Sequence, residues 1–253
     1  MRFESITSRH NAYLAHLRKL AASRSYRDEC GEYLGDGTKL LDEALKWNAP
    51  LRAVVVSEGA EVPDLPEGVR AVRVSTELMR YVSPAETPQG VLFTAALERP
   101  ALPDRLDGVR YLVLDGVQDP GNVGTILRTA DAFDCGGVFL VNACADLYNP
   151  KTVRATMGAI FRQRVWTCTA DELAVLLERS GVPLFGAALR GDTVPLGSAG
   201  LARAAVAIGS EGRGLSEELL ERCSGTLRIP MSERCESLNA AIAAAIVLWE
   251  MYR

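Results

Sequence analysis

The stretch "DGVQDPGNVGTILRTADAF", residues 115–133, decides how the carboxy-terminal part of this 253-residue chain is interpreted. A short apolar run, Tyr111 to Leu114, precedes it, and an amphipathic run follows it. Open parallel α/β sheets bind their ligands at the carboxyl ends of the strands, and this stretch falls at such an end. Its glycines fit neither G-x-G-x-x-G nor the P-loop pattern, which argues against an ordinary dinucleotide or triphosphate site.

The pattern around this stretch predicts an α/β domain. We expect strands at 110–114, 137–141, 164–167, 183–187, 204–208 and 226–229, and helices from about 122 and at 149–160, 170–179, 215–221 and 238–252. Such alternation predicts a mainly parallel sheet covered on both faces. The last helix is apolar on nearly every side, so it is buried either within the core or between its own sheet and a partner subunit.

The amino-terminal part has the pattern of a smaller α/β domain. Residues 7–22 begin with Thr and Ser as capping candidates and continue with apolar residues at helical spacing. Strand and helix patterns then alternate up to "TPQGVLFTAAL" (87–97). The stretch 98–108, "ERPALPDRLDG", has the composition of an interdomain linker. We therefore expect domains at 1–97 and 109–253, joined by this linker.

Composition places the chain among soluble globular proteins, since 48% of its residues are hydrophobic and 24% are charged. We expect a cytoplasmic protein without a membrane segment, because no leader pattern opens the sequence and the longest apolar run is too short for a bilayer. Six scattered cysteines lack the C-x-x-C spacing of a zinc or redox site. We expect reduced, mostly buried thiols and no metal.

The charge distribution leaves two interpretations of the amino terminus open. The net charge of −4 argues weakly against a nucleic-acid-binding protein. However, the first 27 residues contain six basic side chains and one acidic side chain, a net charge of +5, which leaves −9 for the remainder. Such a segment suits a patch that contacts phosphates, and it suits a solvated helix face equally well.

Three segments follow predicted strands and have the composition of ligand-binding loops. They are the stretch 115–133, "AIGSEGRGLSEE" (207–218) and "IPMSERCESLNAA" (229–241). Glycines without a Cβ let backbone N–H and C=O groups approach a ligand closely. Ordinary turns would explain any one of these loops taken alone.

Together and in this order, the three segments resemble the three motifs of the SpoU/TrmH branch of the SPOUT methyltransferases. "YNPKTVRATMGAIF" (148–161) matches an intermediate segment of the same family. The resemblance covers residues 110–253. It extends more loosely, through "NAYLAHLRKL", "DGTKLLDEAL" and "TPQGVLF", to the amino-terminal RNA-binding domain that many members possess.

The resemblance implies a carboxy-terminal parallel-sheet domain with a deep trefoil knot and a smaller, ribosomal-protein-like α/β domain before it. It implies transfer of a methyl group from S-adenosylmethionine to a ribose 2′-hydroxyl of RNA, by a homodimer formed through the carboxy-terminal domain. Large-subunit (23S) rRNA is the favoured substrate and tRNA the main rival. A catalytically inactive RNA-binding protein of this fold and a methyltransferase for a base nitrogen also stay open.

The resemblance also assigns roles to individual residues. It places Asn122, Arg128, Glu211, Ser237 and Asn239 at the reaction site. It places Leu189, Gly209, Ile229 and Leu238 at the cofactor. For RNA binding, the basic candidates are Arg9, Arg18, Lys19, Arg24, Arg27 and Arg154. A guanidinium is a poor base, so we expect Arg128 to stabilise negative charge and Glu211 to be the more conventional base, although a deprotonated Arg128 stays open.

Overall fold

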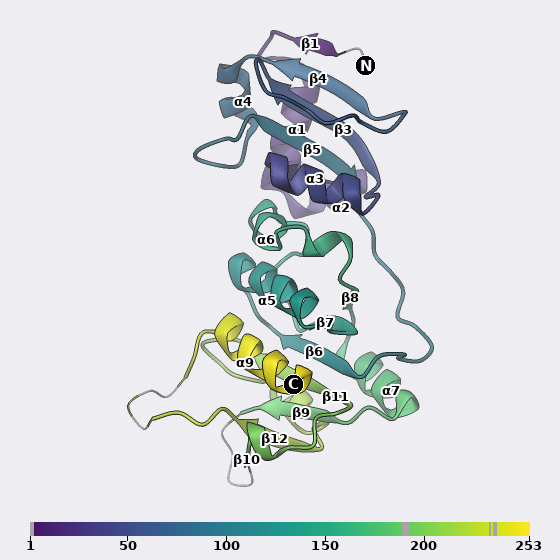
Figure 1. Ribbon diagram of the computed structural model, residues 1–253, viewed down its shortest axis with the longest axis vertical. Helices are drawn as coiled ribbons and strands as arrows, with labels where there is room; N and C mark the ends of the chain where they lie inside the picture. The colour runs from purple at the N-terminus through teal and green to yellow at the C-terminus, as the bar shows by residue number, and fades with distance from the viewer. Residues whose placement is uncertain (1–2, 189–192, 233, 235–236) are drawn as a thin grey trace. The chain divides into compact units, whose positions relative to one another are not determined.

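The computed structural model describes residues 3–188, 193–232, 234 and 237–253 (Figure 1). The chain forms two compact units, each with its own sheet. The first unit comprises Met1–Glu98 together with Asp146–Phe161. The second comprises Arg99–Ala145 and Arg162–Arg253.

A mixed five-stranded sheet forms the centre of the first unit, in the order β1-β4-β3-β5-β2. Its strands are β1 (Glu4–Ile6), β2 (Glu32–Asp36), β3 (Leu51–Ser57), β4 (Arg70–Val74) and β5 (Val91–Ala96). Strand β5 runs antiparallel to both β2 and β3, whereas β4 is parallel to β1 and β3. Because side chains alternate along β3, Val55 and its neighbour Val54 contribute to separate cores on the two faces.

Four helices of the first unit precede its last strand: α1 (Ala12–Ala22), α2 (Arg24–Cys30), α3 (Thr38–Lys46) and α4 (Thr76–Val82). Leucines of α1 and α4 join the core that contains Val55, and leucines of α3 join the core that contains Val54. Helix α1 begins five residues later than predicted. The side chain of Asn11, rather than Thr7 or Ser8, accepts the hydrogen bond that caps it.

A segment that interrupts the second unit, residues 146–161, completes the core of the first. It contains α6 (Pro150–Ala155) and the short 3₁₀ helix η1 (Ala159–Phe161). The ring of Tyr148 packs on Tyr33, with 4.7 Å between ring centres, and Val153 is fully buried in the same cluster. The predicted helix 149–160 is too long, because Met157 and Gly158 adopt positive φ angles that end it.

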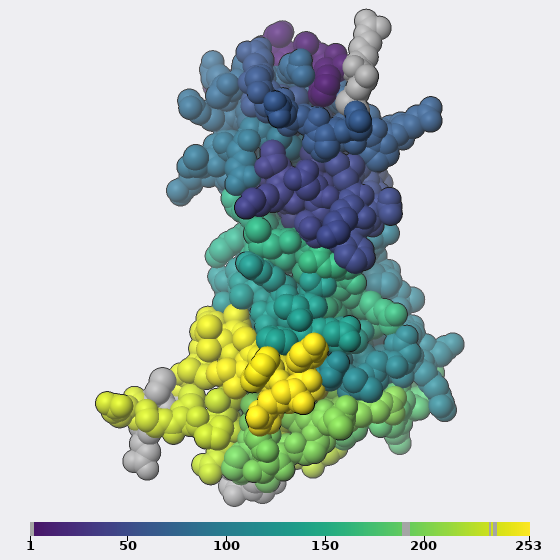
Figure 2. All heavy atoms as spheres, in the orientation of Figure 1, coloured from purple at the N-terminus to yellow at the C-terminus, as the bar shows by residue number. Residues whose placement is uncertain are grey.

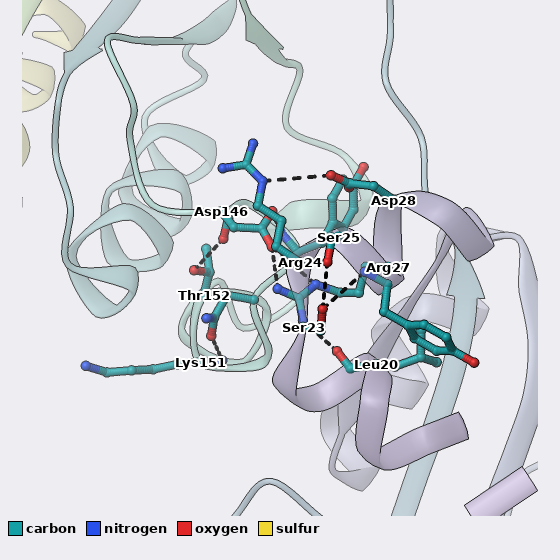
Figure 3. Close-up of polar contacts among 12 residues, drawn as sticks. Leu20, Ser23, Arg24, Ser25, Arg27, Asp28, Asp146, Lys151 and Thr152 are labelled. Atoms are coloured by element: carbon teal, nitrogen blue, oxygen red, sulfur yellow. Dashed lines mark hydrogen bonds and ion pairs between the residues drawn. The ribbon is translucent and has the colours of Figure 1, made fainter. Parts of the chain in front are cut away.

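An internal ion pair fastens this segment to α2 (Figure 3). Arg27 is 2% exposed, and its guanidinium Nη2 lies 2.6 Å from a carboxylate oxygen of Asp146. Arg27 also donates to the carbonyl of Leu20, and the Asp146 carbonyl accepts from Thr152. The guanidinium of Arg27 is therefore occupied inside the fold, which corrects its assignment as an RNA contact.

We expect Asp146→Asn to lower the free energy of unfolding of the first unit by about 3–5 kcal/mol, because it leaves a buried arginine without its counter-charge. Glu4→Gln is the matched control, since its pair with Arg70 lies at the surface and is expected to contribute no more than about 1 kcal/mol. Urea unfolding followed by circular dichroism measures both. Equal effects of the two substitutions would contradict a stabilising role for the buried pair.

Seven parallel strands form the sheet of the second unit, in the order β10-β12-β9-β11-β6-β7-β8. Their bounds are β6 (Arg110–Asp115), β7 (Gly137–Val141), β8 (Val165–Thr167), β9 (Leu184–Ala187), β10 (Val194–Pro195), β11 (Ala204–Gly209) and β12 (Gly225–Arg228). The predicted parallel α/β architecture is confirmed. The two-residue strand β10 had no counterpart in the sequence prediction.

Helices cover both faces of this sheet. They are α5 (Pro120–Ala132), α7 (Ala170–Ser180), α8 (Glu217–Leu220) and α9 (Ala240–Tyr252), with the 3₁₀ helix η2 (Leu196–Ser198). Helix α7 packs on the face that Val113 and Phe139 occupy. Helix α9 packs on β6 and β11 and lies beside α5 (Figure 1). The carboxyl ends of β6 and β11 thus lead into the first two predicted ligand loops.

Helix α9 is not enclosed by its own unit. Its buried side faces the sheet, but Ile242 and Trp249 are each 53% exposed and Tyr252 is 49% exposed. Figure 2 shows this helix, in yellow, at the surface. An exposed apolar stripe of this kind marks an interaction site more often than an isolated apolar side chain does.

Thiols, metals and membranes give few further constraints. Among the five described cysteines only Cys135 is buried, at 7% exposed, so the expectation of mostly buried thiols is too strong. Burial raises the pKa of Cys135 to about 11. No group of side chains suited to a metal ion occurs in the described parts of the chain. No helix among those same residues is long and apolar enough to cross a membrane.

Candidate active site

The turn that opens α5 fixes the first site residue, Asn122. Asp119 caps the helix by accepting a hydrogen bond from the backbone N–H of Asn122 at 2.9 Å, and Pro120 occupies the first turn. Proline suits that position because its missing N–H has no partner there and its φ is preset for a helix. The Pro-Gly-Asn-x-Gly sequence is therefore the first turn of a helix. It holds Asn122 at a fixed place beyond the end of β6.

The second loop presents Glu211 on a tight hairpin. The backbones of Ser210 and Gly214 bond to each other in both directions, at 2.9 and 3.1 Å, so the loop folds back on itself. A Cβ added at Gly209 would overlap the carbonyl carbon of Gly214. Only glycine permits this close approach, and the hairpin carries Glu211 at its exposed end.

The third loop delivers Asn239 at the amino terminus of α9. The Oδ1 atom of Asn239 accepts from the backbone N–H groups of Ala241, at 2.9 Å, and Ile242, at 3.3 Å. These two hydrogen bonds make Asn239 the cap of α9. The Nδ2 atom of the same side chain is free to bond elsewhere, so the cap and the site use different atoms.

Asn122, Glu211 and Asn239 meet in one hydrogen-bonded triangle. Asn239 Nδ2 donates to Asn122 Oδ1 at 3.1 Å and to Glu211 Oε1 at 3.2 Å, and Asn122 Nδ2 also donates to Glu211 Oε1. The three predicted loops therefore converge. Both amides bind the same carboxylate oxygen, and among the described residues Glu211 Oε2 has no partner. A carboxylate held in this way can accept a proton through its second oxygen.

A pocket of about 470 Å³ opens beside the triangle. Its walls come from the loops after β9, β11 and β12 and from the start of α9. Four predicted residues line it together with Glu211: Gly209, Ile229, Ser237 and Leu238. Leu189, also predicted at the cofactor, lies outside the described residues. The volume falls within the range of roughly 300–1,000 Å³ typical of small-molecule sites.

Arg128 does not join the triangle. It lies six residues beyond Asn122 on α5, which places it about 9 Å further along the helix axis. Its side chain is exposed, and among the described residues it has no hydrogen-bond or ion-pair partner. Within one chain no hydrogen bond or ion pair joins Arg128 to the described residues of the triangle, and its role at the reaction centre stays a prediction.

Asp115 is a site residue that the sequence motifs did not assign. It ends the apolar strand β6 and is 3% exposed. Its carboxylate accepts from the backbone N–H of Ser216 at 2.6 Å and from the amide of Asn142 at 2.8 Å. It thereby fastens the end of the loop that carries Glu211 to the strand that leads to Asn122. A single carboxylate directly after the apolar run 111–114 was the available signal.

Several of the predicted RNA contacts lie on the exposed surface of the first unit. Arg9 and Arg18 both lie against the ring of Tyr81. Lys19 is exposed, with its ammonium 5.3 Å from the centre of the Tyr26 ring. These three cations remain available to a ligand.

The other two predicted contacts have acidic neighbours. Arg24 Nε lies 3.9 Å from the Asp28 carboxylate, in an exposed pair one helical turn apart. Arg154, on α6, is exposed and lies near Asp36. Burial raises the pKa of Asp36, while a hydrogen bond from Ser83 and the charge of Arg154 oppose that rise. No hydrogen bond or ion pair joins Arg154 to Asp36 among the described residues, so the Arg154 guanidinium remains available to a ligand.

Family comparison agrees with this geometry. Residues 110–249 match the model of the SpoU rRNA methylase family, and residues 11–93 match that of the MRM3-like substrate-binding domain. The loops that meet in the triangle all lie within the first match. The chain belongs to the SpoU rRNA methylase family, which confirms the resemblance found in its sequence.

Similar proteins extend over nearly the whole chain. The 23S rRNA (guanosine(2553)-2′-O)-methyltransferase RlmP of Bacillus subtilis is 30% identical over 98% of this chain and 99% of its own. The 23S rRNA (uridine(2479)-2′-O)-methyltransferase of Streptomyces viridochromogenes is 31% identical over 98% and 91%. The crystal structure of the AdoMet-bound rRNA methyltransferase from Sinorhizobium meliloti has a TM-score of 0.87 and 27% identity, covering 98% and 97%.

Proposed function

We propose that this protein is an S-adenosylmethionine-dependent methyltransferase for a ribose 2′-hydroxyl of large-subunit (23S) rRNA. The observation that carries the proposal is the convergence of Asn122, Glu211 and Asn239 beside a pocket of cofactor size. Two similar proteins of nearly equal length are named for 23S rRNA 2′-O-methylation. The first unit, with its match to a substrate-binding domain, supplies the RNA-binding surface.

The pocket suits S-adenosylmethionine. Its backbone groups at Gly209, which has no Cβ in the way, and at Ile229 and Leu238 can bond to the edge of an adenine, and its apolar side chains suit a flat ring. When bound, this cofactor supplies an electrophilic methyl group on a sulfonium. No metal enters the scheme.

The chain's own residues then hold and deprotonate the ribose. Glu211, fixed through Oε1 by Asn122 and Asn239, takes the proton of the 2′-hydroxyl on its free Oε2. Ser237 lines the same pocket and positions the reacting groups. Asp115 holds the loop that carries Glu211 in place through its hydrogen bond with the backbone N–H of Ser216. Orientation and proton acceptance are thus divided among different side chains.

A trefoil knot and a homodimer are the further parts of this proposal. Strand β12 lies between β9 and β10, although β11 intervenes along the chain and pairs elsewhere, on the other side of β9. That order supports a knotted path through the pocket loops. The exposed apolar stripe of α9, at Ile242, Trp249 and Tyr252, supports a dimer formed through the second unit. A dimer interface would remove these apolar side chains from water, which stabilises the dimer.

In such a dimer, Arg128 acts on the site of the partner subunit. Its exposed position on α5, beside α9, suits a residue that crosses the interface. A guanidinium keeps its charge, and its fork of N–H groups binds phosphate or developing alkoxide charge. This role would explain why Arg128 makes no contact with the triangle of its own chain.

We expect Arg128→Ala and Glu211→Gln each to lose about 10²-fold or more in turnover. Mixed after co-refolding in equal amounts, they should recover about a quarter of wild-type activity, because half the dimers then contain one intact composite site. Methyl transfer to rRNA measures the recovery. If both residues served the same chain's site, or if the protein stayed monomeric, the mixture would remain inactive.

Mapping of ribose methylation in total RNA, from cells with and without the protein, tests the function directly. We expect one 2′-O-methylated nucleotide in 23S rRNA to disappear. A lost mark in tRNA, or a label on a base, would favour a different substrate. Isothermal titration with S-adenosylmethionine separates an enzyme from an inactive RNA-binding protein, which should give no heat. The free thiols of Cys30, Cys135, Cys144 and Cys168 suit a reducing compartment, and we place the reaction in the cytoplasm.

A further inference from the structure

Three residues of the first unit form a distinct surface feature, which we call the Tyr81 clamp: Arg9, Arg18 and Tyr81. The guanidinium carbon of Arg9 lies 4.1 Å from the centre of the Tyr81 ring, and that of Arg18 lies 4.4 Å from it. Arg18 Nη1 also donates to the phenol oxygen at 2.7 Å. Arg9 precedes α1, Arg18 lies on α1 and Tyr81 lies on α4, so two packed elements bring both cations to one ring.

The clamp carries uncompensated positive charge. Among the described residues, no carboxylate lies within 4.0 Å of either guanidinium. Two cations held on one ring repel each other, and a bound anion would relieve that repulsion. Hydrogen bonding by Arg9 lowers the pKa of the Tyr81 phenol most, and hydrogen bonding by Arg18 lowers it less. Both effects reflect the local positive charge.

Arg70 of the same unit is an arginine whose charge is balanced by a neighbouring carboxylate. It too stacks on a tyrosine, with its guanidinium carbon 4.1 Å from the centre of the Tyr13 ring. However, it forms hydrogen bonds to the Glu4 carboxylate at 2.8, 2.9 and 3.0 Å. Arg70 therefore shares the stacking of the clamp and lacks its free charge, which makes it a matched comparison.

We propose that the Tyr81 clamp binds phosphate groups of the RNA backbone, with Tyr81 as the positioning residue that holds both Arg9 and Arg18 at its ring. The inference rests on the proposed function, which supplies the RNA. Guanidinium N–H groups match phosphate oxygens in geometry, and RNA presents one phosphate per nucleotide. The ring limits the freedom of two long side chains before RNA arrives, so less conformational entropy is lost when they bind.

The test compares binding of full-length variants to protein-free 23S rRNA over a series of salt concentrations. Each phosphate contact adds about −0.7 to −0.9 to the slope of log affinity against log salt concentration. Over the tenfold range from about 1 M to about 0.1 M salt, one contact therefore raises the affinity roughly sixfold. For Arg9→Gln/Arg18→Gln we expect the slope to shrink by about 1.5 and affinity at about 0.1 M to fall roughly 30-fold. Arg70→Gln should stay within about twofold of wild type.

Variants of the ring separate its positioning role from a purely structural one. Tyr81→Phe keeps the ring and is expected to bind RNA within about threefold of wild type, whereas Tyr81→Ala should lose about fivefold or more. Arg9→Lys/Arg18→Lys keeps both charges and should keep most of the salt slope. Circular dichroism and the affinity for S-adenosylmethionine should not change in any of these variants.

A double Arg→Gln variant with the same salt slope and affinity as Arg70→Gln would overturn the clamp. If the wild-type enzyme still methylates rRNA in that case, the proposed function survives without it. If the wild type neither binds nor methylates rRNA, the proposed function fails, and the clamp loses its ligand with it.

Discussion

Glu211→Gln is expected to lower turnover of rRNA methylation by about 10²–10⁴-fold, the range that a positioned general base contributes. Glutamine has nearly the shape of glutamate, and its Oε1 can still accept hydrogen bonds from Asn122 and Asn239. The second terminal atom becomes an amide nitrogen, which cannot accept the ribose proton. The loss should therefore appear in kcat, with little change in KM.

Single-turnover methylation of rRNA, with tritiated methyl donor, measures this effect. Glu218→Gln is the matched control, because Glu218 lies nearby on α8 and faces Arg222 at the surface. It should retain turnover within about twofold, as surface pairs contribute little. Turnover of Glu211→Gln within about threefold of wild type would transfer the role of base to another group.

Gly209→Ala is expected to raise the Kd for S-adenosylmethionine at least tenfold. The added methyl group would overlap the backbone of Gly214 and Leu215, which no side-chain movement can relieve. Forcing extra volume into a packed site costs typically about 1–3 kcal/mol. The hairpin from Ser210 to Gly214 carries Glu211 and forms a wall of the pocket. Its displacement should therefore weaken cofactor binding and also move Glu211 away from the ribose hydroxyl.

Isothermal titration gives this dissociation constant directly. Gly200→Ala provides the control, since a Cβ at Gly200 would meet no atom within 4 Å. It should leave both cofactor affinity and melting temperature unchanged. Unaltered cofactor binding by Gly209→Ala would show that the hairpin adapts, and that its tight form is not needed for the pocket.

The architecture of the second unit was largely predictable from sequence. Strands and helices alternate there with clear periodicity, and β7 occurs at the predicted residues. The convergence of Asn122, Glu211 and Asn239 followed from the three motifs, because loops at the carboxyl ends of parallel strands share one edge of a sheet. The supporting role of Asp115 was missed, since one residue gives no periodic signal.

Tertiary context explains the parts that failed. Arg27 looks like any other cation of a basic segment, and only its distant partner Asp146 shows that it is internal. Thr7 and Ser8 are as suitable for capping as Asn11, so sequence could not choose among them. In the dimer that we propose, the role of Arg128 depends on a second copy of the chain, which no pattern within one sequence describes.

The segment 146–161, which completes the core of the first unit, affects how the protein folds as it leaves the ribosome. Domains generally fold as units during synthesis, beginning with the amino-terminal one. Here Tyr33 and Phe93 are covered by Tyr148 and Phe161, which are translated later. Nascent chains ending near residue 98 would therefore leave an apolar face uncovered, and we expect them to engage chaperones until residue 161 has cleared the exit tunnel.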